Sequence, residues 1–170
     1  GRIPRSAIAA IDAQQIRNLN DAAITRRLGD VWGEVRDTPE AKKQLLARYK
    51  AELPPAQLAA ANLSLGRSVF ASTCGACHLL YGEGGRLGPD LTGGARRHDL
   101  DSLLAKIIDP SAELPVASRY TIVKLKDGRT VGGIVDNRTA TILTLRTVAD
   151  PVTVAIADIQ STELSTASLM

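Results

Sequence analysis

Five consecutive residues, Cys74 to His78, read Cys-Gly-Ala-Cys-His and contain both cysteines of the chain and one of its two histidines. Two thiols separated by two residues and followed directly by an imidazole form the pattern that attaches haem covalently and ligates its iron. Each thiol can add to one vinyl group of the porphyrin, and the adjacent His78 can then bind the iron as the proximal axial ligand. The sequence therefore predicts one covalently bound haem, with Cys74, Cys77 and His78 as its attachment and ligand residues.

Two other kinds of site use the same residue types. A structural zinc site usually has four protein ligands, and the only further histidine is His98. Cys77 and His78 are adjacent, and adjacent side chains rarely both reach one tetrahedral ion. A thioredoxin-like thiol pair needs a βαβ context, and the residues before Cys74 do not alternate as a strand does. The motif by itself leaves these alternatives open, and the flanking residues favour haem.

The residues before the motif predict a helix over 64–73, with Ser64 as its N-cap. One face of this helix carries Leu65, Val69 and Phe70 at helical spacing. Gly66 is unfavourable inside a helix, so we expect another backbone to approach the helix closely there.

A loop and a second helix are expected after the motif. Residues 82–88 include four glycines, a composition that excludes a helix or an ordinary strand. Residues 99–109 then show the helical period, and Pro110 ends it. The expected buried stripe of this helix consists of Leu100, Leu103, Leu104, Ile107 and Ile108.

The first 61 residues predict three helices. The first is expected to begin at Ser6 and the second at Asp21, and Thr38-Pro39 predicts a third that opens with a capping threonine and a proline at its first position. The second helix should turn Ile24, Leu28, Val31 and Trp32 inward. We interpret Trp32 as a core residue rather than as a cover for the haem edge.

Residues 120–164 change to a period of two. Asp127-Gly128 lies between two alternating segments, which is a strong signal for a hairpin. Further alternating segments are expected at 141–145, 152–156 and 159–164. Short strands at this spacing predict a small antiparallel barrel or sandwich, and the segment from Leu125 to Ile134 is similar to Sm-like barrels. RNA binding is disfavoured because the turns lack stacking aromatic residues and basic clusters.

Taken together, the motifs resemble the haem-binding c-type cytochrome domain of the planctomycete and verrucomicrobial kind. Four segments carry the resemblance, namely the Cys-x-x-Cys-His motif at 74–78, Gly-Pro-Asp-Leu at 88–91, Ile-Ile-Asp-Pro-Ser at 107–111 and Lys-Asp-Gly-Arg at 126–129. The resemblance implies an α+β fold with a mainly helical haem core. Its implied parts are an N-terminal helical segment over 1–61, the haem core over 62–119 plus 165–170, and an inserted β domain over 120–164.

The same resemblance implies roles for residues outside the motif. Phe70 and Leu91 would bind the haem, and the Pro89 carbonyl would accept a hydrogen bond from Nδ1 of the proximal histidine, a contact that fixes the ring and raises its basicity. Met170, the only methionine, is the implied distal ligand of the iron. His98 is the alternative distal ligand, and an open sixth position is the third possibility.

The function that the resemblance implies is single-electron transfer through one haem c. It also implies a redox partner protein, with a fused or separate dehydrogenase as the electron donor, and an electron-transfer domain is favoured over a catalyst by itself. Two alternatives remain: a haem enzyme or gas sensor with an open coordination position, and a partner-docking module in which the haem is structural.

The composition and charge of the chain limit its possible partners and its location. A net charge of +3 over 170 residues, without long basic runs, argues against nucleic acid as a partner. No apolar run approaches the length of a membrane span. Covalent haem attachment takes place outside the cytoplasm in bacteria, so the resemblance implies a periplasmic or otherwise extracytoplasmic protein. The chain begins at Gly1, and we expect a processed product or part of a longer protein.

Overall fold

The structure is a computed structural model that describes residue 8 and residues 10–170. It combines helices with a five-stranded antiparallel sheet, so the predicted α+β class is confirmed. The helices are α1 (Ala10–Arg17), α2 (Ala22–Val31), α3 (Glu40–Glu52), α4 (Pro55–Ala59), α5 (Leu63–Thr73), α6 (Gly94–Arg97) and α7 (Leu100–Ile108). The short strands are β1 (Gly33–Val35), β2 (Leu79–Leu80), β3 (Glu83–Gly84) and β4 (Glu113–Pro115), and the sheet strands are β5 (Tyr120–Leu125), β6 (Thr130–Arg138), β7 (Ile142–Arg146), β8 (Val152–Ala155) and β9 (Ile159–Leu164).

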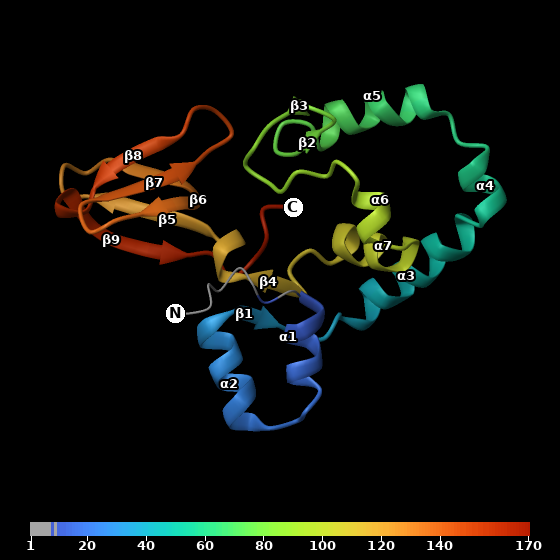
Figure 1. The fold of residues 1–170 in the computed structure, drawn as a ribbon, viewed down its shortest axis with the longest axis horizontal. Coiled ribbons are helices and arrows are strands. Elements are labelled where there is room, and N and C mark those ends of the chain that lie inside the picture. The colour runs from blue at the N-terminus through green and yellow to red at the C-terminus, as the bar shows by residue number, and fades with distance from the viewer. Residues whose placement is uncertain (1–7, 9) are drawn as a thin grey trace.

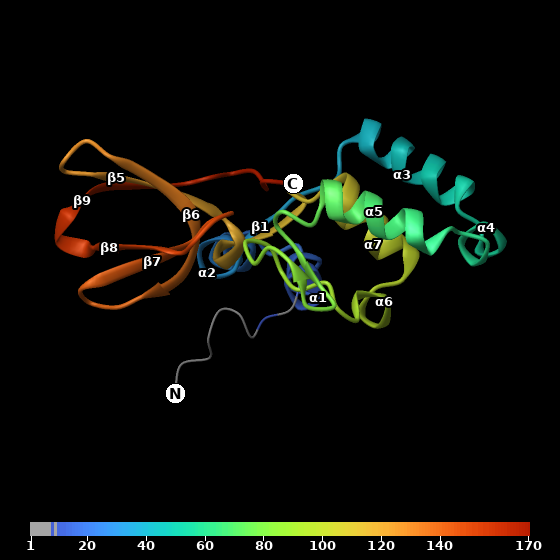
Figure 2. The ribbon, with the colours of Figure 1, turned by 90° about the horizontal axis from the view of Figure 1, so that it is seen from above.

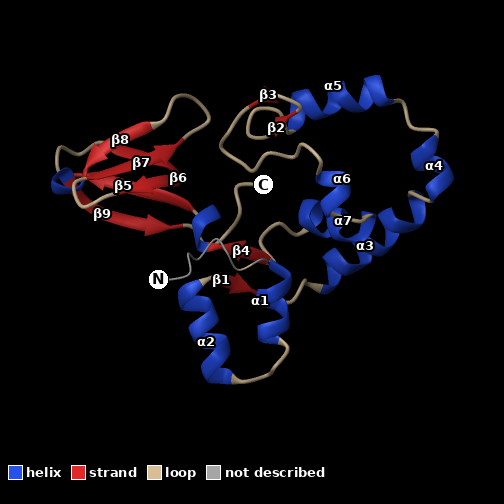
Figure 3. Cartoon of the chain, in the orientation of Figure 1, coloured by secondary structure: helices blue, strands red, loops and turns tan. Residues whose placement is uncertain are grey.

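The molecule is elongated, with the sheet at one end and helices α3 to α7 at the other (Figures 1 and 2). Helices α1 and α2 and the β1–β4 ladder lie between them. The colouring by secondary structure in Figure 3 shows that the strand content is concentrated in the sheet, whereas the region around α5 and α7 is built from helices and loops.

The N-terminal helices form a small core around Trp32, which is buried together with Ala13 and Leu28. The Trp32 indole Nε1–H donates a hydrogen bond to the Ile8 carbonyl at 2.8 Å. The interpretation of Trp32 as a core residue is therefore confirmed. The start of α2 is also as predicted, because the Asp21 carboxylate accepts hydrogen bonds from two backbone N–H groups of the first turn. The expected start at Ser6 lies outside the described residues.

Two predictions about this region are wrong. Ile24 and Val31 are exposed rather than inward, since the core of α1 and α2 is narrow and only Leu28 and Trp32 reach it. Helix α3 begins at Glu40 with Pro39 at the N-cap position, and no described side chain caps its first turn. The predicted threonine cap is therefore not formed, and the rigid φ of proline alone marks the start of the helix.

The segment after Trp32 joins the N-terminal helices to the rest of the protein. Strand β1 pairs antiparallel with β4, and the ladder is extended at both ends by hydrogen bonds from Arg36 N to Ala112 O and from Val116 N to Trp32 O. Gly33 adopts a positive φ of +133° against the backbone of β4, where a Cβ atom would overlap the Leu114 carbonyl. This short ladder therefore fixes residues 33–36 against the chain that follows α7.

Helix α5 begins at Leu63, because Asn62 is the N-cap and its side-chain oxygen accepts a hydrogen bond from Leu65 N at 3.0 Å. The prediction of Ser64 as the cap is wrong by two residues, since asparagine caps a helix at least as well as serine. The close approach expected at Gly66 is also wrong within the described part of the chain, because a Cβ atom built there would meet nothing within 4 Å.

The sheet has the strand order β8-β7-β6-β5-β9, with every neighbouring pair antiparallel. The turn at Asp127-Gly128 is the predicted hairpin, and Gly128 adopts a φ of +87°. Register shifts in the β5–β9 and β6–β7 pairs bend the strands. The sheet therefore curls, so that β5 and β9 face β7 and β8 (Figure 2). The described strands β8 and β9 are edges, so the hydrogen bonds do not close the barrel that was one of the predicted alternatives.

Candidate functional site

Helix α5 leads directly into the Cys-x-x-Cys-His motif. The backbone N–H groups of Cys74 and Gly75 both donate to the Phe70 carbonyl at 2.8 Å, and His78 N donates to the Cys74 carbonyl at 2.9 Å. The motif thus forms one tight turn at the C-terminal end of the helix. Both thiols are free; Cys74 is exposed and Cys77 is half-buried. The turn therefore carries two free thiols, one exposed and one half-buried, beside one histidine.

His78 is nearly buried, with 9% of its surface exposed. Its Nδ1 lies 2.9 Å from the Pro89 carbonyl oxygen. A carbonyl oxygen can only accept, so Nδ1 carries the proton and donates it. The lone pair of the neutral ring is then on Nε2, the nitrogen that remains for a metal. The Pro89 carbonyl therefore sets both the tautomer and the orientation of the imidazole.

Gly88 provides the space that the imidazole occupies. A Cβ atom on Gly88 would lie 2.5 Å from Cε1 and 2.7 Å from Nδ1 of His78, closer than real side-chain carbon atoms approach. The backbone of the glycine-rich loop therefore packs directly against the ring face. Any larger residue at position 88 would push the ring away from the Pro89 carbonyl.

The glycine-rich loop is held to the motif by three backbone hydrogen bonds. Gly85 N donates to the Gly75 carbonyl, Gly88 N to the Cys77 carbonyl and Leu91 N to the Leu79 carbonyl, at 2.8 to 2.9 Å. The β2–β3 pair joins Leu79–Leu80, just after the motif, to the start of this loop and adds its own ladder. The loop thus folds over the turn that carries the two thiols, and its position does not depend on side-chain packing alone.

The end of the loop has a local network of its own. The Asp90 carboxylate accepts a hydrogen bond from Thr92 N at 2.7 Å, and Thr92 Oγ1 accepts one from Tyr81 N at 2.9 Å. Hydrogen bonds from the Thr92 side chain and backbone lower the pKa of Asp90 below its usual value. Asp90 is therefore a loop-closing acceptor next to Pro89.

Helices α5 and α7 and the C-terminal segment, residues 165–170, expose a set of large apolar side chains. No residue of α5 is buried, and α7 buries only Leu104. The predicted buried stripe of α7 is therefore wrong in part, because Leu103 and Ile107 are exposed. The exposed set consists of Leu63, Leu65, Val69, Leu103, Ile107, Leu169 and Met170. Apolar residues exposed at this density indicate a surface that a large apolar group would cover.

The residues present fit a haem. Two free thiols lie on the turn that carries the histidine, Nε2 of that histidine has no hydrogen-bond partner within the described residues, and Gly88 leaves room for the ring. Phe70, which binds haem by resemblance, is half-buried on the last turn of α5, and Leu91 is half-buried at the end of the loop. No group of three or more His, Cys, Asp or Glu side chains among the described residues has the geometry of a metal site.

The two candidate distal ligands have different surroundings. Met170 is 60% exposed, and its backbone N donates to Ser168 Oγ at 3.2 Å. Ser168 N in turn donates to Ser111 Oγ at 3.0 Å. His98 is half-buried, and its Nδ1 is engaged with Ser102 Oγ at 3.0 Å. The site roles of Met170, His98, Phe70, Pro89 and Leu91 stay predictions.

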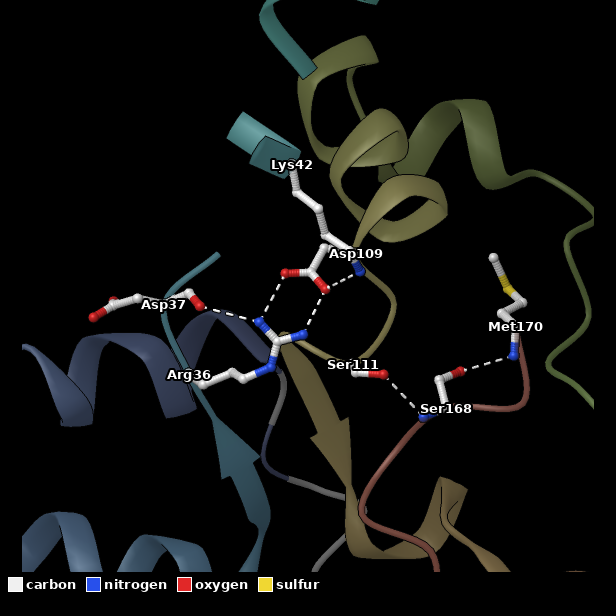
Figure 4. Close-up of polar contacts among 7 residues, drawn as sticks. All are labelled: Arg36, Asp37, Lys42, Asp109, Ser111, Ser168 and Met170. Atoms are coloured by element: carbon white, nitrogen blue, oxygen red, sulfur yellow. Dashed lines mark hydrogen bonds and ion pairs between the residues drawn. The ribbon is translucent and has the colours of Figure 1, made fainter. Parts of the chain in front are cut away.

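A buried ion cluster near the C-terminal segment was not predicted from the sequence (Figure 4). The Asp109 side chain is 1% exposed. Its carboxylate accepts two hydrogen bonds from Arg36, at 2.6 and 3.0 Å, and one from Lys42 at 2.7 Å. Burial by itself raises the pKa of Asp109, but the hydrogen bonds from Lys42 and Arg36 outweigh it, so the pKa lies below its usual value. The only sequence signal was the Asp-Pro-Ser segment that contains Asp109.

Comparison with known proteins supports this site. Residues 63–128 match the family model of cytochrome c, which covers α5, the motif, the glycine loop, α7 and the first hairpin strand of the sheet. A search of curated proteins found no match. A cytochrome c domain with one Cys-x-x-Cys-His motif implies one covalent haem c, haem-based electron transfer and a redox partner. In the part of the chain that the structure describes, no helix has the length and apolar character needed to cross a membrane.

Proposed function

We propose that this chain transfers single electrons through one haem c attached to Cys74 and Cys77, with His78 and Met170 as the two axial ligands. The observation that carries the proposal is the geometry around His78, where two free thiols share one turn with an imidazole whose Nδ1–H is engaged by the Pro89 carbonyl. The haem, when bound, supplies the one-electron reduction and oxidation.

The residues of the chain hold and tune that group. Cys74 and Cys77 fix the macrocycle to the end of α5, and the Pro89 carbonyl makes His78 a stronger and better-oriented donor. Phe70 and Leu91 contribute apolar contacts that exclude water, which keeps the local dielectric low. We propose that this haem core comprises residues 62–119 plus 165–170, with 1–61 as an N-terminal helical segment and 120–164 as an inserted β domain.

Met170 is the proposed distal ligand because the C-terminal segment ends beside the haem core. Figures 1 and 2 place the C-terminal end between α7 and the loop that follows β3. The Met170 side chain is available, since it is largely exposed. A thioether opposite an imidazole raises the reduction potential relative to two imidazoles, so we expect a protein that accepts electrons from a donor of lower potential.

We propose a dehydrogenase as that donor, either fused to this chain or separate from it. This part of the proposal rests on the resemblance of the motifs and on the methionine ligation that we expect. Because c-type cytochromes are typically extracytoplasmic, we further propose a periplasmic or otherwise extracytoplasmic location.

The first test is attachment. The full chain is produced in a bacterial host that matures c-type cytochromes, and its pyridine haemochrome spectrum and intact mass are measured. We expect the mass of one haem per chain and the spectrum of a haem with both vinyl groups saturated. Cys74→Ala should give the spectrum of a single thioether bond, with Ser72→Ala as the neighbouring control. Colourless protein, or protein that carries zinc, would contradict the proposal.

The second test is the distal ligand. Oxidised protein with methionine ligation shows a weak near-infrared charge-transfer band, which Met170→Ala should abolish while Leu169→Ala leaves it in place. The reduction potential should fall in Met170→Ala only. If that variant keeps its low-spin spectrum and His98→Ala loses it, His98 is the ligand. High-spin iron in the unaltered protein that readily binds carbon monoxide would instead favour the haem enzyme or gas sensor.

A further inference from the structure

We propose that Ser111, in the turn between α7 and β4, positions Met170 as a ligand by anchoring the C-terminal segment. The proposal rests on the proposed function, because it assumes that Met170 binds the iron. Its structural basis is a chain of two hydrogen bonds, from Ser168 N to Ser111 Oγ at 3.0 Å and from Met170 N to Ser168 Oγ at 3.2 Å (Figure 4). Ser111 is therefore a positioning residue that acts on Met170 through Ser168.

The C-terminal segment depends on this contact. After β9, Ser165 N still donates to the Tyr120 carbonyl at 2.8 Å. From Thr166 to Met170, the hydrogen bond to Ser111 is the only one in the described structure that reaches another part of the chain, because the others stay within the segment. Terminal residues lose order unless something holds them. The hydrogen bond to the Ser111 hydroxyl thus fixes the position of the backbone just before Met170.

The turn that carries Ser111 is itself held from both sides. The Asp109 carboxylate, almost fully buried, binds Arg36, which directly follows β1, and Lys42 of α3. Arg36 N also donates to the Ala112 carbonyl at 2.9 Å, and Ala112 N donates to the Asp109 carbonyl at 3.0 Å. Ion pairs and backbone bonds therefore surround Ser111 within two residues on each side. A hydroxyl on such a turn is a fixed anchor rather than a mobile surface group.

The direction of the methionine agrees with this role. Figure 4 shows the Met170 side chain pointing away from Ser111 and Asp109, into the region between α7 and the loop that leads to α6. The anchored residue, Ser168, and the residue that carries the sulfur, Met170, are two positions apart. Holding the backbone at Ser168 leaves only the last two residues free, which restricts the volume in which the sulfur moves.

The experiment measures how strongly Met170 competes with an added ligand. Imidazole is titrated into the oxidised full-length holoprotein, and its displacement of methionine is followed in the Soret and near-infrared spectrum. Ser111→Ala removes the anchor, so the apparent affinity for imidazole should rise about three- to tenfold, the range that one net hydrogen bond supplies. Ser111→Thr keeps the hydroxyl and should stay close to the unaltered protein. Ser118→Ala, an exposed serine two positions before the start of β5, is the matched control and should change nothing.

The double variant separates positioning from a general effect. In Met170→Ala, imidazole has no competitor and should bind more tightly than in Ser111→Ala. Adding Ser111→Ala to Met170→Ala should then have no further effect, because the anchor has nothing left to position. A further rise in the double variant would overturn the inference by showing that Ser111 acts on the pocket itself.

Failure of the inference and failure of the proposed ligation give different results. If Met170→Ala raises the imidazole affinity but Ser111→Ala matches Ser118→Ala, methionine ligation holds and the role of Ser111 is refuted. If Met170→Ala leaves the imidazole affinity unchanged, Met170 is not the ligand, and both the ligation and the inference fall.

Discussion

The sheet and the haem region both contain many apolar side chains but bury them differently. In the curled sheet, the two halves that face each other enclose a hydrophobic core formed by Val123, Leu125, Leu143, Leu145 and Val154. In the haem region, α5 buries nothing and α7 buries one leucine. The sheet is complete as folded polypeptide, whereas the helices around the motif present their apolar residues to solvent.

This difference indicates that the haem is part of the core of its own region. An isolated helix of 11 residues is marginal in water and depends on packing of its apolar face. Here Leu65 is 61% exposed, so the described polypeptide does not cover this side chain of α5. The backbone bonds of the glycine loop prepare the histidine, and a bound macrocycle would supply the missing apolar contacts.

The largest expected effect follows from removing the attachment. The double variant Cys74→Ala, Cys77→Ala should lose haem and with it the order of α5. Hydrogen exchange followed by mass spectrometry should show amide protection in α5 and α7 falling about 100-fold or more relative to the holoprotein, since local opening free energies range from near zero to the global value.

The sheet is the internal control for that experiment. Protection in β5 and β7 should change by less than about threefold, because their core contains no haem-region side chain. Equal loss of protection in both regions would break the comparison and show that they unfold as one unit.

The second prediction concerns Asp109, which lies where the N-terminal, haem and C-terminal segments meet. Asp109→Asn leaves Arg36 and Lys42 facing a neutral amide, and removing one partner of a buried ion pair costs about 3–5 kcal/mol. The loss should appear in urea unfolding followed by haem absorbance. Asp136→Asn is the control, since its ion pair with Arg146 is at the surface of the sheet. If Asp109→Asn lowers the free energy of unfolding by less than about 1 kcal/mol, the ion cluster does not stabilise the haem region.

The same residue gives a pH dependence with a defined sign. The folded-state pKa of Asp109 is lowered by its cation partners, so the carboxylate contributes stability above its unfolded pKa of about 3.9. That contribution is lost as the pH falls through the lower folded-state pKa. The unaltered protein should therefore become steeply less stable below about pH 4, and Asp109→Asn should show a shallower decline in the same range.

Much of this architecture was predictable from local patterns. The Asp21 cap, the Asp-Gly hairpin and the five alternating segments are local signals, and each appears in the structure. The Asn62 cap was missed because Asn62 and Ser64, two positions apart, are both good N-cap residues. The exposed Leu103 and Ile107 were missed because helical periodicity gives a face but not what covers it.

For the candidate site, the thiols and histidine were predictable because their spacing is itself the chemistry. The Asp109 cluster was not, because Arg36 and Lys42 lie more than 60 residues before it and are brought there by the β1–β4 ladder. The link from Ser111 to Ser168 spans 57 residues and depends on the path of the whole sheet. Contacts of this kind follow from tertiary structure, which no local pattern contains.

The third prediction compares matched leucines in the two regions. Leu143→Ala removes a fully buried side chain of the sheet and should cost about 2–5 kcal/mol. Leu65→Ala in the protein without haem should cost less than about 1 kcal/mol, since that side chain is already largely exposed. Urea unfolding of both variants, monitored by circular dichroism, makes the comparison. With haem bound, the cost of Leu65→Ala should increase, and an unchanged cost would show that haem does not cover α5.

The smallest predicted effect concerns the contact that joins the two regions. Arg146 in β7 donates through Nη1 to the Arg86 carbonyl at 3.0 Å, just before the residues that pack on His78. Arg146→Ala removes this hydrogen bond to an exposed carbonyl, worth about 0.5–1.5 kcal/mol, together with the surface ion pair to Asp136. The sheet should keep its stability, while the Gly88 amide, which is bonded to the Cys77 carbonyl, should exchange about three- to tenfold faster. Arg138→Ala, at the exposed end of β6, is the matched control. If the Gly88 amide exchanges at the same rate in both variants, the glycine loop is held by the motif alone. The two regions would then share no energetic link through this contact. The difference between a self-sufficient sheet and a haem-dependent helical region would become sharper.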